Sequence, residues 1–153
     1  MNDQAEVLLR QAQSHRAAGR SAEAADAYAA LLELRPNLPD TWFNLALMQR
    51  QAGRPAQALA SYQQALDRGV QGPEEVHLNR AVIYSDDLGQ SEAAKAELDR
   101  ALAIAPDYLP ALLNLGNLHE DRGERDAARA AYAKALSLSP PASAPLALAR
   151  LAN

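Results

Sequence analysis

Small and aromatic apolar residues recur along this chain at a nearly constant spacing, and polar residues fill most positions between them. One set consists of alanines, a second of glycines, and a third of aromatic residues with one leucine. The members are Ala24, Ala58, Ala94 and Ala128; Gly19, Gly53, Gly89 and Gly123; and Tyr28, Tyr62, Leu98 and Tyr132. All three sets step by 34, 36 and 34 positions. A shared period near 34 predicts stacked helix–turn–helix repeats rather than one globular core.

Each repeat is predicted to hold two helices, separated by one of the periodic glycines. We expect four repeats, at residues 5–38, 39–72, 74–108 and 109–142, in a single all-α domain that covers residues 1–153. Ser21 and Ser91 are predicted to cap second helices. A short apolar helix is expected over residues 143–152. It fits either a lid on the last repeat or the start of a repeat in a longer protein.

Composition and charge exclude several classes of function. The 153 residues carry a formal net charge of −4, without a basic block or nucleic-acid-binding motif. No cysteine and no membrane-spanning apolar run are present, and the amino terminus does not resemble a signal peptide. We therefore expect a cytoplasmic protein that contacts neither nucleic acid nor membrane. His15, His77 and His119 fall in different repeats, and no catalytic motif is present, so we expect no metal, no cofactor and no enzymatic activity.

The repeats resemble the tetratricopeptide pattern W-x2-L-G-x2-Y…A-x3-F…P. The second repeat matches it with Trp42, Leu45, Ala58 and Tyr62, and the other three repeats match in phase. His15, Gln49 and His119 depart from it, because they stand where the pattern prefers tyrosine. The resemblance implies a right-handed α-solenoid of about four hairpins, in which the first helix of each repeat lines a concave groove. Segments 75–84 and 112–123 are also similar to bacterial tetratricopeptide regions that often precede a sulfotransferase-like domain.

Three asparagines occupy corresponding positions in successive repeats. Asn44, Asn79 and Asn114 are spaced by 35 and 35 residues, whereas the alanine set steps by 36 and then 34. One extra residue in the join at 69–72 and another near Asp86 and Asp87 account for the difference. Asparagine is unfavourable inside helices, because its amide competes for backbone hydrogen bonds. The row therefore either binds a peptide backbone, similar to the asparagine ladder in O-linked N-acetylglucosamine transferase, or is scaffold that bonds neighbouring helices.

The predicted groove combines amides, apolar side chains and charges. The candidate peptide-binding residues are Asn44, Asn79, Asn114, Asn117, Phe43, Leu78, Leu113, Arg10 and Arg50. We expect Phe43 to be the most accessible of the apolar members. Basic residues gather in the first half of the predicted groove, and acidic residues such as Asp86, Glu120 and Asp121 gather in the second. Such a field would orient a partner with one basic and one acidic end.

The main functional prediction is a protein-interaction module that binds a peptide or protein segment in this groove. One alternative is a substrate-recruiting arm of a larger transferase, with its catalytic domain outside this sequence. Another is a structural solenoid that self-associates through its terminal helix. A clamp for chaperone C-terminal carboxylates is disfavoured, because the only lysines, Lys95 and Lys134, lie in second helices.

Overall fold

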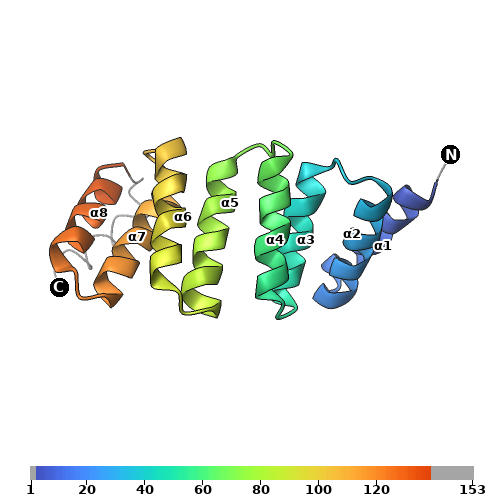
Figure 1. Cartoon of the computed structure of the whole chain (residues 1–153), viewed down its shortest axis with the longest axis horizontal. Coiled ribbons are helices and arrows are strands. Elements are labelled where there is room, and N and C mark those ends of the chain that lie inside the picture. Colours follow the sequence, from blue (N-terminus) through green and yellow to red (C-terminus); the bar gives the residue numbers. More distant parts are fainter. Residues whose placement is uncertain (1–2, 139–153) are drawn as a thin grey trace. The chain divides into compact units, whose positions relative to one another are not determined.

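The computed structural model describes residues 3–138, and within this range every regular element is a helix (Figure 1). The first helix of each repeat is called its A helix and the second its B helix. The elements in order are α1 (Gln4–Ala17), α2 (Ser21–Leu34), α3 (Pro39–Gln51), α4 (Pro55–Asp67), α5 (Pro73–Val82), the π-helical turn η1 (Ile83–Asp87), α6 (Ser91–Ile104), α7 (Leu109–Asp121) and α8 (Arg125–Leu138). The expected all-α fold of repeated hairpins is confirmed. The helix expected over 143–152 lies outside the described residues.

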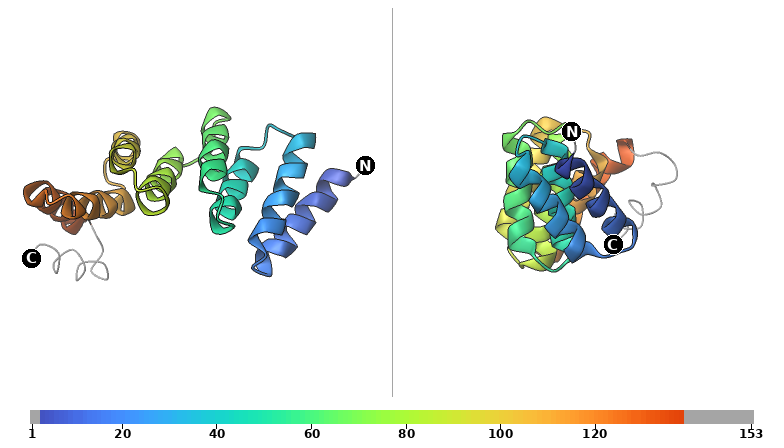
Figure 2. Two further views of the ribbon diagram at one scale, coloured as in Figure 1. Left: turned by 60° about the horizontal axis from the view of Figure 1, so that its bottom comes forward. Right: turned by 90° about the vertical axis from the view of Figure 1, so that its right-hand side faces the viewer.

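The chain forms two compact units, residues 1–76 and 77–153, and each is described by itself. Within the first unit, α1 packs against α2, α2 against α3, and α3 against α4. Within the second unit, α6 packs against η1 and α7, and α7 against α8. Figure 2 shows the α1–α2 and α7–α8 pairs as antiparallel hairpins.

Short turns join the helices of each hairpin. In the second repeat, Gly53 has a φ of 77°, a left-handed conformation that glycine adopts without steric cost. Its N–H donates to the carbonyl of Arg50 at 3.0 Å, and the N–H of Arg54 donates to Gln49 at 2.8 Å. Pro55 then occupies the first turn of α4, where its missing N–H costs nothing.

The prediction that serines cap the B helices is wrong by one position. α2 and α6 begin at Ser21 and Ser91, so the cap residues are Arg20 and Gln90, and neither makes a side-chain cap bond. In this short turn the cap residue Arg20 donates its backbone N–H to the carbonyl of His15 at 2.8 Å, and α2 begins at the next residue. The Ser21 hydroxyl instead donates to Gln51 at 3.0 Å, which links α2 to α3.

Alanine and tyrosine build the core of the first unit. Ala12 and Ala24 are fully buried, and this lets α1 and α2 approach closely enough to enclose Tyr28, which is 1% exposed. Tyr62 of α4 is equally buried and meets the ring of Phe43 edge-on, with a centroid distance of 5.5 Å. These contacts place the periodic tyrosines inside the hairpins, as the repeat pattern predicts.

The second unit repeats this arrangement, but in the fourth repeat a glycine replaces the alanine that faces the buried tyrosine. Tyr132 is 1% exposed, and a Cβ added at Gly116 would overlap its ring. The other repeats have alanine in place of Gly116. The Tyr132 hydroxyl donates to Asn117 at 2.6 Å and to Glu120 at 3.2 Å. These bonds attach α8 to α7, and the position of the ring explains why repeat four needs glycine.

The extra residue near Asp86 and Asp87 lies inside a helix rather than in a loop. In the other three repeats, the B-helix cap residue donates its N–H to a residue five positions earlier: Arg20 to His15, Arg54 to Gln49 and Glu124 to His119. In the third repeat Gln90 donates to Tyr84, six positions earlier, at 2.7 Å. The π-helical turn η1 accommodates the extra residue as a single-turn bulge within the helix.

Deleting Asp87 should therefore be tolerated. The deletion restores the five-residue separation of the other repeats and converts η1 to ordinary α-helix. We expect the free energy of unfolding, measured by chemical denaturation, to change by less than about 1 kcal/mol. Deleting Gln51 from α3, which has no inserted residue, is the matched control and should destabilise the chain clearly. Equal losses from the two deletions would contradict this account of η1.

Candidate functional site

A cavity opens in the second unit between η1 and α7, with α6 beneath it. Its volume is about 350 Å³. The lining combines small apolar residues with amides, a hydroxyl and carboxylates: Ala81, Ser85, Asp86, Ala94, Leu98, Asn114, Asn117, Leu118 and Asp121. The polar members come from η1 and from one face of α7, because positions 114, 117 and 121 lie within two helical turns of one another. The cavity therefore belongs to the A-helix side of this unit.

The asparagine row keeps its register through the inserted residue. Asn44, Asn79 and Asn114 each lie five positions before the A-helix carbonyl that accepts from the B-helix cap residue. This confirms that one extra residue follows Asn79 within the third repeat. Arg10 holds the corresponding position in the first repeat. All three asparagines are half-buried, so their amides are partly accessible.

The asparagine side chains already make internal contacts. Asn44 accepts a hydrogen bond from Arg16 of the neighbouring α1 at 3.2 Å. The amide nitrogen of Asn114 donates to the Pro110 carbonyl of its own helix at 2.8 Å. Asn117 accepts from Tyr132, and Asn79 also has a partner. These hydrogen bonds fix the amide orientations of Asn44, Asn114 and Asn117, and Asn114 keeps its side-chain oxygen available as an acceptor.

The apolar candidates are less accessible than the sequence suggests. Phe43 is half-buried because its ring packs against Tyr62, and Leu78 and Leu113 fall in the same burial class, so the expectation that Phe43 is the most accessible apolar candidate stays a prediction. Leu78 packs against the core of the second unit, and Leu113 on α7 is also half-buried. Among large apolar side chains of the A helices, Val7 and Leu9 of α1 are more exposed, at 45% and 37%.

The basic candidates lie in the first unit. Arg10 is exposed, and with Val7 and His15 it lines a shallow depression on α1. Arg50 is half-buried near the end of α3 and has a partner within the described residues. Acidic side chains, Asp86 and Asp121, line the cavity of the second unit. The expectation that the two signs of charge separate along the groove stays a prediction.

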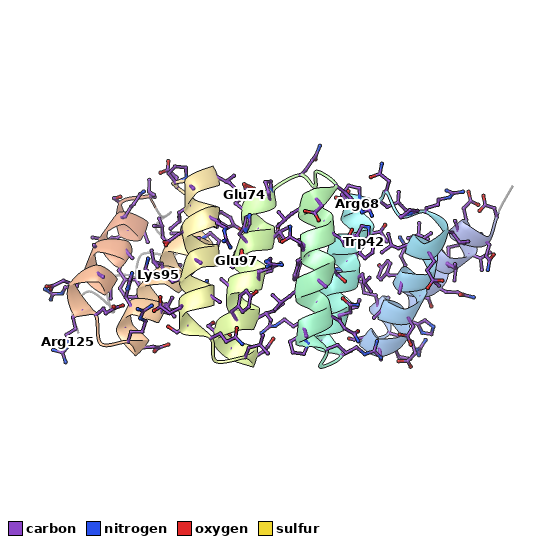
Figure 3. The ribbon with its side chains drawn as sticks, viewed as in Figure 1. Trp42, Arg68, Glu74, Lys95, Glu97 and Arg125 are labelled. Atoms are coloured by element: carbon purple, nitrogen blue, oxygen red, sulfur yellow. The ribbon has the colours of Figure 1, made fainter. Side chains whose placement is uncertain are left out.

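A buried ionic cluster in the third repeat was not predicted from the sequence. Glu97 of α6 is 1% exposed, and its carboxylate lies 2.8 Å from His77 Nδ1 and accepts from Arg80 Nε at 2.9 Å. Figure 3 labels Glu97 on α6 beside α5. Burial raises the pKa of Glu97, but the hydrogen bonds from His77 and Arg80 and their charges outweigh it, so the pKa is lowered.

Comparison between repeats shows why the cluster arises. The positions that hold Trp42, Leu45 and Ser61 in the second repeat hold His77, Arg80 and Glu97 in the third. Ser61 there donates to Gln49 at 2.6 Å inside an otherwise apolar contact. Three polar replacements at mutually contacting positions were the available sequence signal, because isolated buried charges are strongly disfavoured.

The remaining histidines serve packing and hydrogen bonding. Arg20 donates to Nδ1 of His15 at 3.0 Å, and Nδ1 of His119 lies 2.8 Å from the carboxylate of Glu124. Within residues 3–138, no group of three or more His, Cys, Asp or Glu side chains has the arrangement of a metal site. No helix in that range is long and apolar enough to cross a lipid bilayer.

Family profiles described as tetratricopeptide repeat match three consecutive stretches of the sequence, at residues 9–73, 74–108 and 110–142. The stretches join close to the expected repeat boundaries and together span nearly all of the described helices. No curated protein sequence matches the chain significantly.

Solved structures with the same arrangement of helices include several repeat proteins. A tetratricopeptide repeat protein from Parabacteroides merdae is 26% identical, with a TM-score of 0.84, and the match covers 97% of this chain and 59% of that protein. The MamA protein is 24% identical, with a TM-score of 0.78, over 96% of this chain and 82% of MamA. YrrB, described as having an unusual peptide-binding site, is 16% identical, with a TM-score of 0.72, over 94% of this chain and 72% of YrrB.

Proposed function

Because this chain belongs to the tetratricopeptide-repeat family, whose members bind protein partners, we propose that it is an interaction module that holds a peptide segment along its A helices. The observation that carries the proposal is the recurrence of Asn44, Asn79 and Asn114 at one register position on three A helices. An amide both donates and accepts, so it can bond a peptide backbone whatever the peptide's side chains are.

Two further observations support this function. YrrB, which shares the fold, is a tetratricopeptide protein with a peptide-binding site, although its low identity carries the likeness of fold alone. The cavity on the A-helix side of the second unit adds a recess where a ligand side chain can enter. The alternative of a recruiting arm for a transferase rests on the resemblance of two segments and stays a prediction.

The proposal is tested by selecting peptides from a phage-displayed library on the whole chain and titrating them calorimetrically. Asn79→Ala should weaken binding about fivefold, because one neutral hydrogen bond contributes about 1 kcal/mol. Peptides of different sequence should lose similar amounts, since the bond is to their main chain. Gln63→Ala, which removes an exposed amide from α4 of the first unit, should bind as the wild type does.

The thermal melting of the variants separates the proposal from its structural alternative. If Asn44→Ala, Asn79→Ala and Asn114→Ala all bind selected peptides like the wild type, the asparagine row does not hold the ligand. If instead Asn79→Ala lowers the melting temperature by several degrees, the row is scaffold that bonds neighbouring helices. Both results contradict the proposed role.

A further inference from the structure

The cavity between η1 and α7 has a lining of two distinct kinds. Its floor is apolar and is formed by Ala81, Ala94 and Leu98, which are at most 2% exposed. Its rim is polar and includes Ser85 and Asp86 of the π-helical turn and Asp121 at the end of α7. A ligand group that fills it must therefore place apolar atoms against the floor and polar atoms against the rim.

The rim offers hydrogen-bond acceptors in excess of donors. The side chain of Asp121 makes no hydrogen bond or ion pair with any residue between 3 and 138. Within the same range, Asp86 has a single side-chain partner, the Ser85 hydroxyl, which donates to it at 3.0 Å. The side-chain amide of Asn114 donates one of its two N–H groups to the Pro110 carbonyl, and its oxygen stays available as an acceptor. Among residues 3–138, no lysine, arginine or histidine lines the cavity.

We propose that this cavity receives the side chain of a lysine or arginine from the bound segment. The aliphatic stem of either residue covers the apolar floor, while its cationic head donates to the carboxylates of Asp86 and Asp121 and to the oxygen of Asn114. A bare inorganic cation would leave the floor uncovered. This inference deepens the proposed function and rests on it, because it assigns one side-chain preference to the segment held by the A helices.

The inserted residue of the third repeat helps to form the proposed pocket. Ser85 and Asp86 both belong to η1, the turn that absorbs the insertion, and both line the cavity. In the other repeats the same stretch is one residue shorter. The π-helical turn thus supplies one of the two carboxylates, and π-bulges are frequent at functional sites.

A defined probe tests the pocket apart from any selected peptide. The whole chain, labelled with 15N, is titrated with N-acetyl-arginine amide and separately with its citrulline counterpart, which is similar in size and neutral. We expect saturable shifts of the amide signals at Asp86, Asn114 and Asp121 with the arginine probe, and clearly weaker binding of the citrulline probe. Raising the salt concentration should weaken the arginine probe, because exposed charge pairs are screened.

Variants assign the effect to the pocket. Asp121→Asn removes one carboxylate with little change of shape and should weaken the arginine probe severalfold. Asp126→Asn removes an exposed carboxylate of α8 that does not line the cavity, and it should bind like the wild type. Three results would overturn the inference: no saturable shift up to the solubility of the probe, equal binding of both probes, or an Asp121→Asn variant that binds like the wild type.

The peptide library separates failure of the pocket from failure of the proposed function. Selected peptides that need Asn79 but contain no lysine or arginine would overturn the pocket and leave the peptide-binding function standing. A probe that saturates at Asp121, together with a library that yields no binder, would overturn the peptide-binding function, and the cavity would remain a site for basic groups.

Discussion

Replacing Glu97 by alanine should lower the free energy of unfolding by about 3–5 kcal/mol, the usual loss when one partner of a buried ion pair is removed. The substitution leaves Arg80 and His77, whose side chains are 12% and 14% exposed, without the carboxylate that satisfies them. Arg100, which is largely exposed, loses only a weak contact at 3.3 Å. Urea denaturation monitored by circular dichroism measures the loss.

A matched variant distinguishes the loss of the ionic contacts to Glu97 from the loss of packing. The second repeat shows what an uncharged version of this contact contains, so His77→Trp, Arg80→Leu and Glu97→Ser are combined in one chain. Replacing a whole buried ion cluster by packed apolar groups is often neutral or stabilising. The triple variant should therefore recover most of the stability that Glu97→Ala loses. A triple variant as unstable as Glu97→Ala would show that the cluster itself is required.

Because Glu97 is a carboxylate, the difference in unfolding free energy between the wild type and Glu97→Ala depends on pH. The pKa of Glu97 is lowered in the folded protein, so its stabilising contribution is present above the unfolded pKa of about 4.3. The contribution is lost as the pH falls through the lower folded pKa. The gap in unfolding free energy between the wild type and Glu97→Ala should accordingly be full near pH 7 and shrink below about pH 4.

Replacing Tyr62 by alanine should cost on the order of 3 kcal/mol, as for other large buried aromatic side chains. The ring is 1% exposed and meets Phe43 edge-on at 5.5 Å, so its removal leaves a cavity between α3 and α4. Tyr62→Phe keeps the ring and removes only the hydroxyl, so it should lose about 1 kcal/mol. Chemical denaturation of both variants measures the two losses. Similar losses would show that the hydroxyl, rather than ring packing, stabilises the hairpin.

The architecture could be predicted from the sequence because it depends on residues that repeat. A glycine, an alanine and an aromatic residue at fixed spacing specify where a hairpin turns and what it encloses, and Gly53, Ala58 and Tyr62 do so in the second repeat. The helix starts were misjudged by one residue at Ser21 and Ser91. That detail depends on where the backbone of the turn bonds, which side-chain preference does not determine.

The candidate site was harder to predict, because it depends on departures from the repeat. Spacing located the inserted residue near Asp86, but only the hydrogen bond from Gln90 to Tyr84 shows that it forms a π-helical turn. Phe43 was expected to be accessible because helical periodicity places it on the A-helix face. Its contact with Tyr62 depends on the distance between two helices, which a single sequence does not encode.

The hydrogen bond from the Gln90 N–H to the Tyr84 carbonyl, six positions earlier, also affects how repeats can be exchanged between proteins. A segment cut by counting 34 residues from the second hairpin would be out of phase within the third, and its apolar face would be rotated away from its neighbour. If the two sequences are aligned at the hydrogen-bonded pair of each turn, Tyr84 with Gln90 or Gln49 with Arg54, the transplanted B helix stays in phase. The natural unit of exchange in this chain is thus set by a backbone contact, and its length varies from one hairpin to the next.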